Sequence, residues 1–133
     1  MGPHELVNPP ELSPPVGFAH AVVAAPGRTV YLGGQTAHGQ DGRIRAAGLV
    51  GQFDAALANV VTALAAAGAA PEHLVQVTVY TTDGDGYRRR LRALGEAYRR
   101  HLGKHYPAMA FFEVAGLFDP EALVELVCVA VVP

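Results

Sequence analysis

Two segments decide the fold: Pro107-Ala108-Met109-Ala110-Phe111-Phe112-Glu113-Val114-Ala115-Gly116-Leu117 and Leu123-Val124-Glu125-Leu126-Val127-Cys128-Val129-Ala130-Val131-Val132-Pro133. β-Branched and aromatic residues dominate both segments, which predicts two strands. The intervening Phe118-Asp119-Pro120-Glu121 contains a proline and predicts a short turn, so that the strands form a hairpin. Glu125 is the single carboxylate of the second strand and lies among apolar residues.

The composition favours one globular domain over residues 1–133. Half of the 133 residues are hydrophobic and 17% are charged, which suits one continuous core, and a small apolar domain favours a homo-oligomer. The net charge of −2 gives no reason to expect a nucleic acid or an anionic membrane as a partner. No long apolar run or secretory signal is visible, and a single cysteine excludes an intrachain disulfide. We therefore expect a cytoplasmic protein.

The first half of the chain predicts strands followed by a helix. Residues 1–15 are rich in proline and predict an irregular arm. Residues 20–25 and 28–33 alternate as strands and flank Pro26-Gly27, which predicts a hairpin, and a short strand is expected at residues 43–46. From Leu49, apolar residues recur every three or four positions until Gly68, which predicts an amphipathic helix.

The second half returns to a strand and then to a second helix. Residues 74–82 alternate as a strand, and a helix that Asp83 or Asp85 caps is expected to continue to Gly103. Strand, helix and strand in succession predict a crossover onto a mixed sheet. The whole order predicts an α+β layer with two helices on one face of the sheet.

Several short motifs, in this order, resemble the Rid superfamily of reactive-intermediate (imine) deaminases, also called YjgF-like proteins. The motifs are Pro15-Val16-Gly17-Phe18, Gly33-Gly34-Gln35, Val77-Thr78-Val79-Tyr80 with Asp83, Gly95-Glu96-Ala97-Tyr98, Pro107-Ala108, and Val124-Glu125-Leu126. The resemblance runs from about residue 8 to the end of the chain. It implies a chorismate-mutase-like fold with a mixed six-stranded sheet, and a homotrimer with a central barrel and three ligand clefts between neighbouring subunits.

The resemblance also implies a site, from which this chain departs at one central position. In the deaminases, an Arg after Pro-Ala holds the substrate carboxylate, and a water held by the Glu of the last strand attacks an imine carbon. Here Met109 stands at the Arg position, so the chain resembles a branch without that anchor, although Gly34, Gln35 and Glu125 remain. Further departures are Phe18 for Tyr, Gly33 for Ser, Gly95 for Asn and Phe111 for Cys. The implied cleft is therefore more apolar than in the deaminases.

Each candidate residue has a functional and a structural interpretation. Glu125 is the candidate catalytic residue, since a carboxylate buried among apolar residues suits water activation, but it could instead pair with an Arg at an interface. The candidate ligand-binding residues are Phe18, His20, Gly33, Gly34, Met109 and Phe111. His20 could supply a titratable group to the cleft or could simply cap a strand, and His38 has weaker grounds for a role. Cys128 should face the core, opposite Glu125.

Other motifs predict no metal and no cofactor. His101 and His105 have the spacing of a metal pair on a helix, but Gly103 interrupts the helix, so we expect both to face solvent. Seven of the ten Lys and Arg residues lie between Arg88 and Lys104. That cluster could bind RNA, although it lacks interleaved aromatic residues and equally serves to keep a helix face soluble.

The sequence therefore predicts a small-molecule ligand bound in an inter-subunit cleft. If the protein is an enzyme, we expect water addition to a C=N bond, as in an imine or enamine, without a carboxylate anchor and with Glu125 orienting the water. A non-catalytic ligand-binding module is the alternative. An RNA-acting protein is the least favoured hypothesis.

Overall fold

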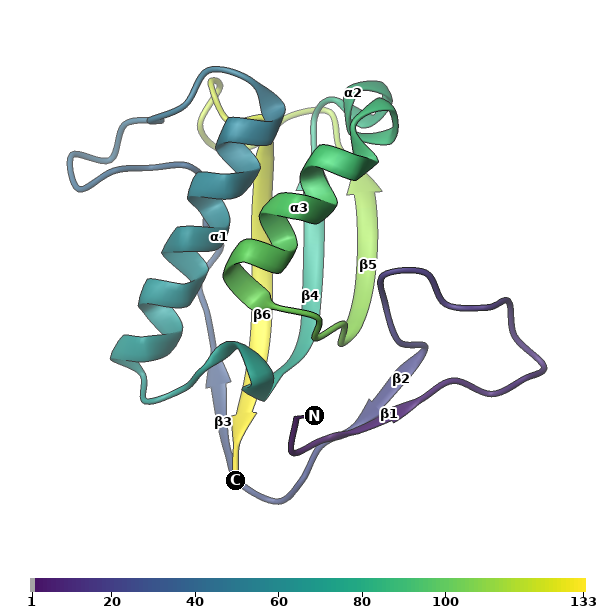
Figure 1. Cartoon of the computed structure of the whole chain (residues 1–133). Helices are drawn as coiled ribbons and strands as arrows, with labels where there is room; N and C mark the ends of the chain where they lie inside the picture. Colours follow the sequence, from purple (N-terminus) through teal and green to yellow (C-terminus); the bar gives the residue numbers. More distant parts are fainter. Residues whose placement is uncertain (1) are drawn as a thin grey trace.

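The computed structural model describes residues 2–133 and has two sheets, with the helices α1 and α3 against one face of the larger sheet (Figure 1). The larger sheet has the strand order β3-β6-β4-β5, and β1 pairs with β2 separately. The elements are β1 (Glu5–Val7), β2 (Ala21–Val23), β3 (Arg28–Tyr31), α1 (Leu49–Ala66), a 3-10 turn (Pro71–His73), β4 (Leu74–Thr81), α2 (Gly84–Arg89), α3 (Leu91–Leu102), β5 (Ala108–Glu113) and β6 (Val124–Val132).

The hairpin expected between the last two strands is wrong. β6 runs antiparallel to both β3 and β4, and β5 runs parallel to β4, so β4 separates β5 from β6. Alternate residues of β6 are buried from Val124 to Ala130, as in a strand with one face on the core, and its two neighbours make it a central strand. Because α2 and α3 form the crossover from β4, they deliver β5 parallel to β4.

The expected early hairpin and the strand at residues 43–46 are also wrong. β1 lies within the arm that was expected to be irregular, and β2 pairs with it. β3 pairs instead with β6. Gly27 lies against the backbone of β6: a Cβ at position 27 would come within 2.7 Å of the carbonyl carbon of Val132. The turn at Gly27 therefore directs β3 onto β6 rather than back to β2. Residues 43–46 contribute only an isolated bridge from Ile44 to His38. The six strands thus form sheets of two and four, not one sheet of six.

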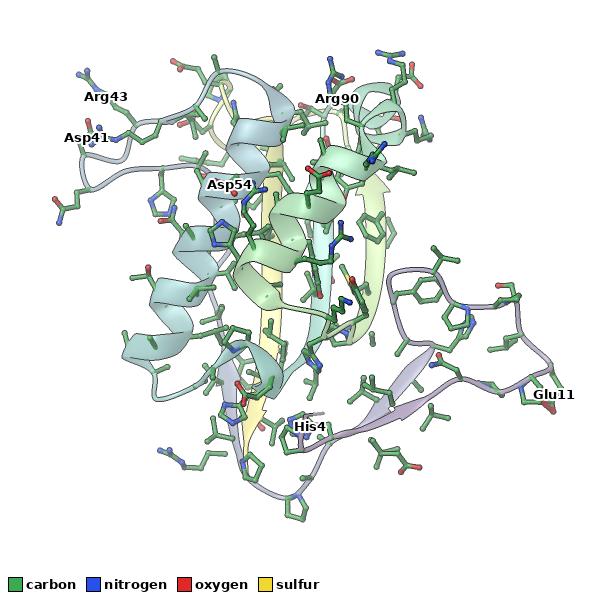
Figure 2. The ribbon with its side chains drawn as sticks, viewed as in Figure 1. His4, Glu11, Asp41, Arg43, Asp54 and Arg90 are labelled. Carbon is green, nitrogen blue, oxygen red and sulfur yellow. The ribbon has the colours of Figure 1, made fainter. Side chains whose placement is uncertain are left out.

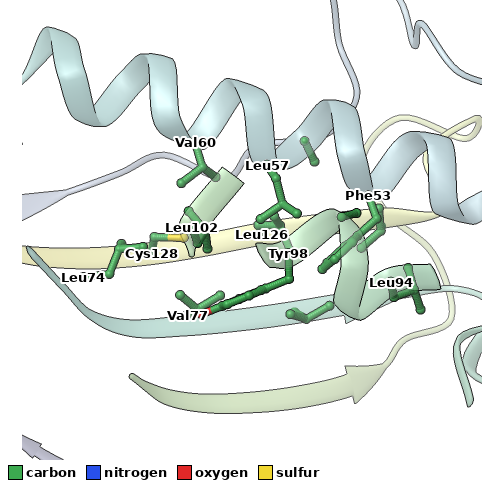
Figure 3. Close-up of a cluster of buried hydrophobic side chains, with 14 of the residues drawn as sticks. Phe53, Leu57, Val60, Leu74, Val77, Leu94, Tyr98, Leu102, Leu126 and Cys128 are labelled. Atoms are coloured by element: carbon green, nitrogen blue, oxygen red, sulfur yellow. The ribbon is translucent and has the colours of Figure 1, made fainter. Parts of the chain in front are cut away.

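The core lies between α1, α3 and the covered face of β4 and β6 (Figure 3). The apolar stripe of α1 (Phe53, Leu57, Val60 and Leu64) is buried there. By length and composition alone, α1 could cross a membrane. Its buried apolar stripe is that of a core helix. Cys128 is 1% exposed, as expected for a core residue, and burial raises the pKa of its thiol to about 12.

The second expected helix is divided into α2 and α3. Asp83 caps α2 as expected, since its Oδ1 accepts a hydrogen bond of 2.9 Å from the backbone N–H of Gly86. Arg90 has non-helical dihedral angles (φ −119°, ψ 26°) and separates the two helices. The apolar residues at steps of three and four predicted a buried stripe of Tyr87, Leu91, Leu94, Tyr98 and Leu102. The last three are buried, whereas Leu91 is 59% exposed and Tyr87 is half-buried.

Candidate functional site

The predicted site residues of β5 lie on the helix-covered side of the sheet. Met109 and Phe111 pair in register with Val77 and Val79 of β4, which are buried beneath the helices. Neighbouring residues in register share one face of a sheet, so both side chains point toward α3. Met109 is half-buried, while Phe111 at the outer edge is 48% exposed.

A cavity of about 380 Å³ lies between β5, the helices α2 and α3, and the backbone at Val16 and Gly17. Its walls are aromatic and aliphatic, and they include Tyr87, Tyr98, Tyr106, Met109, Phe111 and the exposed Arg99. The Tyr87 ring lies 5.5 Å from the Phe111 ring, and the Tyr98 and Tyr106 rings stack at 5.3 Å. Burial raises the pKa of Tyr87 and Tyr98, so both stay neutral, and the Tyr98 hydroxyl donates to the carbonyl of His105 at 2.6 Å.

Phe18 and His20 lie beside the start of β5. Ala19, between them, forms a parallel bridge with Ala108 and donates its N–H to the carbonyl of Pro107 at 3.0 Å. The Phe18 and His20 rings meet edge to face at 5.1 Å. His20 Nε2 donates to the carbonyl of Ser13 at 2.7 Å, so this side chain fastens the arm.

Glu125 lies on the other face of the sheet, which no helix covers. It pairs in register with Tyr80, and the Tyr80 ring stacks on Phe112 at 5.7 Å. Leu126 and Cys128, which alternate with it, face the core. Glu125 is half-buried on this open face, and its side chain lies over Gly34, where a Cβ would come within 2.9 Å of the Glu125 carboxyl carbon.

Gly33 and Gly34 occupy an irregular step beside β6. The Leu32 N–H donates to the carbonyl of Cys128, whereas Gln35 pairs with Leu126. Gly33 and Gly34 therefore lie opposite one residue, Val127, which leaves one extra residue, as in a bulge. Beyond this step, His38 Nε2 lies 3.1 Å from the Gln35 amide oxygen, so His38 supports the turn.

The predicted site residues thus form two groups within one chain. Phe18, His20, Met109 and Phe111 gather around β5 and the aromatic cavity, while Gly33, Gly34 and Glu125 gather beside β6 on the open face. The four-stranded sheet separates Glu125 from Met109, so the two cannot contact one ligand in the same chain.

Sequence reasoning did not place Arg99 at the cavity. Arg99 was expected on the outer, soluble face of the helix and is exposed as expected, yet it also lines the cavity, together with the half-buried Tyr87 and the buried Tyr98. The available signal was position, because Arg99 follows Tyr98 directly and comes one turn after Gly95, at the edge of the apolar stripe.

Three of the seven residues of the basic cluster are engaged in ion pairs. Arg88 pairs with Asp85 and Glu113, Arg92 with Glu96, and Arg100 with Asp54. These surface pairs give part of the cluster a role within the chain, and their carboxylates reduce the positive charge that the cluster could offer to RNA.

His101 and His105 do not face solvent as expected, because both are half-buried and hydrogen-bonded. His101 Nε2 and Arg100 each donate to Asp54 Oδ1 at 2.9 Å, joining α3 to α1. Figure 2 labels Asp54 on α1. Partial burial alone would raise the pKa of Asp54, but these hydrogen bonds and charges outweigh it and lower the pKa. His105 Nε2 donates to the carbonyl of Leu74. No three metal-ligating side chains gather anywhere in residues 2–133.

Comparisons with known proteins agree with this architecture. The model of the family described as endoribonuclease L-PSP matches residues 10–132. The RutC family protein UK114 of Drosophila melanogaster is 32% identical over 128 residues, which cover 95% of this chain and 88% of the fly protein.

Solved structures of Rid-type proteins superimpose on the chain. YyfB of Yersinia pestis, a protein of unknown function in the conserved Rid family, is 30% identical with a TM-score of 0.86, and the match covers 97% of this chain and 98% of that one. Rv2704 of Mycobacterium tuberculosis, from the YjgF/YER057c/UK114 family, is 31% identical with a TM-score of 0.65 over 88% of each chain. These matches confirm the expected α+β, YjgF-like fold. The chain therefore belongs to the endoribonuclease L-PSP family, to which the Rid and YjgF proteins also belong.

Proposed function

We propose that the protein is a homotrimer that binds a small molecule in a cleft between subunits and adds water to a C=N bond. The observation that carries this proposal is the division of the candidate residues between two faces of one sheet. Met109 and Phe111 line an aromatic cavity on the covered face, whereas Glu125 lies on the open face. A second subunit that packs on the open face would bring the Glu125 of one chain to the cavity of the next.

The open face has the composition of an interface. Across β5, β4 and β6 it presents Phe112, Tyr80 and Val127, and β3 adds Tyr31. Phe112 is 51% exposed and Tyr31 79% exposed in the single chain. Large apolar side chains gathered on one face favour burial by another subunit.

The reaction follows from the two halves of such a cleft. The aromatic walls hold the apolar part of an imine and exclude bulk water, while the Glu125 carboxylate accepts a hydrogen bond from one water and orients it toward the C=N carbon. The water adds to the C=N carbon and ammonia then leaves. The net reaction turns the imine and one water into a carbonyl compound and ammonia. Because Met109 has no charge, β5 itself offers no anchor for a carboxylate. We place this reaction in the reducing cytoplasm.

The test is turnover of freshly generated imines. Imines produced enzymatically from amino acids, and uncharged imines of similar size, are incubated with purified protein while release of ammonia and carbonyl product is followed. We expect accelerated release that falls strongly in Glu125→Gln, which preserves shape but removes the acceptor charge. Equal rates in the two proteins would refute the role of Glu125.

A non-catalytic binding module is the alternative. The same cavity favours it, because aromatic walls are sufficient for binding without turnover. Saturable binding of a small molecule with no release of ammonia from any imine would support this alternative and contradict the proposed reaction.

A further inference from the structure

A buried histidine joins the first strand to the body of the protein. His4 is 8% exposed and directly precedes β1, and Figure 2 labels it near the end of β6. Its Nε2 lies 2.9 Å from the carbonyl oxygen of Val131 in β6 and 3.2 Å from the carbonyl oxygen of His73 in the 3-10 turn. Its Nδ1 lies 3.0 Å from the backbone nitrogen of Ala25, between β2 and β3. One ring thus contacts three separate segments.

These partners determine which nitrogen of the His4 ring carries the proton. A backbone N–H can only donate, so Nδ1 accepts from Ala25 and carries no proton. The two carbonyl oxygens can only accept, so Nε2 carries the proton and donates it. A second proton, on Nδ1, would face the N–H of Ala25 and replace a hydrogen bond by a contact between two donors. The ring is therefore held in its neutral form.

Few other contacts hold residues 2–18, which we call the N-terminal segment. β1 has three residues and pairs only with β2, and a two-stranded sheet of this length is marginally stable at best. The hydrogen bonds of Asn8 and Ser13 go to His20, beside the segment. In the described chain, the side-chain hydrogen bonds from this segment to β6 and to the 3-10 turn all come from His4.

The ionisable groups around His4 do not neutralise a second proton on its ring. Within residues 2–133, no carboxylate lies within salt-bridge distance of the ring. A cavity of about 950 Å³ beside His4 is lined by Glu5 of β1, Glu72 of the 3-10 turn, and His101, Lys104 and His105 at and just beyond the end of α3. Glu5, Glu72 and Lys104 are exposed, so water screens their opposing charges. The His73 ring accepts the N–H of Ala70, and β6 and the segment after β2 meet the His4 ring with backbone groups.

We propose that His4 is an acid-sensitive latch, and that uptake of a proton by its ring detaches the N-terminal segment and removes one wall of the aromatic cavity. Val16 and Gly17, which line that cavity, belong to this segment. Val16 is 86% exposed, so little packing holds it once the segment detaches. This inference goes beyond the proposed function, because it concerns how the cavity opens and not the reaction inside it.

The direction of the pH dependence follows from the hydrogen bonds of the ring. While the segment is attached, His4 cannot take a proton on Nδ1 without losing its bond to Ala25. Once the segment is detached, the ring is in water, where a histidine takes up a proton below about pH 6.5. The detached form therefore binds one proton more than the attached form. Detachment should be independent of pH above about pH 7 and become up to about tenfold more favourable for each pH unit below about pH 6.

The experiment measures hydrogen exchange of the β1 and β2 amides by NMR between pH 8 and pH 5, corrected for the intrinsic exchange rate at each pH. In wild type, we expect their protection to fall about tenfold between pH 6 and pH 5, while the α1 amides stay protected. In His4→Asn, protection should not depend on pH, because the amide side chain does not titrate. His4→Phe keeps a ring without hydrogen bonds and should lose protection at every pH. The matched control is His105→Gln, which removes a neighbouring titratable ring, keeps a donor for the carbonyl of Leu74 and should behave as wild type.

Binding of Nile red, a neutral apolar dye, reports on the cavity wall. Its fluorescence should rise in wild type as the protection falls, and it should be high at every pH in His4→Phe. The inference is overturned if wild-type protection is constant from pH 8 to pH 5, if protection in His4→Asn falls as in wild type, or if α1 loses its protection together with β1. A constant Nile red signal would overturn the opening of the cavity. Imine turnover is measured at pH 8, where the latch is closed, so failure of the proposed reaction leaves this test unaffected.

Discussion

Substituting alanine for Gly34 should displace the Glu125 carboxylate while leaving the fold intact. A Cβ at this position would lie 2.9 Å from the Glu125 carboxyl carbon and 3.3 Å from its Cγ, both closer than ordinary contact. The Glu125 side chain is flexible at this end, so it can rotate away at a cost of about 0.5–1.5 kcal/mol. Removing a glycine from the unfolded chain offsets about 0.4–1 kcal/mol of that cost, and the net change in unfolding free energy should stay within about 1 kcal/mol.

The effect on function should be much larger than the effect on stability. Misplacing a water-orienting group by about 1 Å costs on the order of a hundredfold in rate. The matched control is Gly116→Ala, because a Cβ at Gly116 would meet nothing within 4 Å, neither glycine has a positive φ, and Gly116 lies outside the candidate site.

The assay combines urea unfolding with initial rates of ammonia release from the best C=N substrate, and a crystal structure of Gly34→Ala locates the carboxylate independently of turnover. The reasoning fails if the carboxylate stays in place, if Gly34→Ala turns over like wild type, or if Gly116→Ala loses as much activity.

Three further predictions concern other parts of the molecule. Asp54→Asn should lower the unfolding free energy by about 0.5–1 kcal/mol, a value discounted for the exposure of the Asp54–Arg100 pair. Because the pKa of Asp54 is lowered in the folded state, the difference in stability from wild type should be complete above about pH 4 and should shrink as acid protonates the carboxylate. A difference that is unchanged at pH 2.5 would contradict this. Cys128, with a thiol pKa of about 12, should react with a disulfide reagent at pH 8 at least about a thousandfold more slowly in the folded chain than in urea, and rapid labelling without unfolding would show that the core is open. Val127→Glu, which places a charge on the open face, should shift the protein from a trimer to a smaller species in sedimentation, and a monomeric wild type would refute the proposed assembly.

The elements that depend on local periodicity could be predicted from the sequence. α1 and β4 appear within one or two residues of their expected bounds, and the alternation in β6 correctly assigned Cys128 to the core. The choice of strand partners could not be predicted in the same way. Both expected hairpins joined neighbours in sequence, whereas β6 inserts between β3 and β4, which are its non-local partners.

The role of the candidate site residues stays a prediction, and the structure bears only on which of them lie near one another. Gly34 and Glu125 were expected in one cleft and do lie together. Arg99 was not expected to line the cavity, because the apolar pattern of the helix does not show which of its exposed residues borders a cavity. The Asp54–His101 hydrogen bond joins positions 47 residues apart, and no spacing rule predicts it.

The bridge between Ala19 and Ala108 bears on how the chain avoids aggregation. β5 is an edge strand that carries two adjacent exposed phenylalanines, Phe111 and Phe112, and unpaired edges of this kind recruit strands from other molecules. Ala19, which follows the arm, pairs with the first residue of β5 and so protects the point at which an incoming strand would begin to add. Loosening the segment around Ala19 should therefore favour fibrils before it destabilises the core, and the solubility of the chain depends on a segment that adds little to the core.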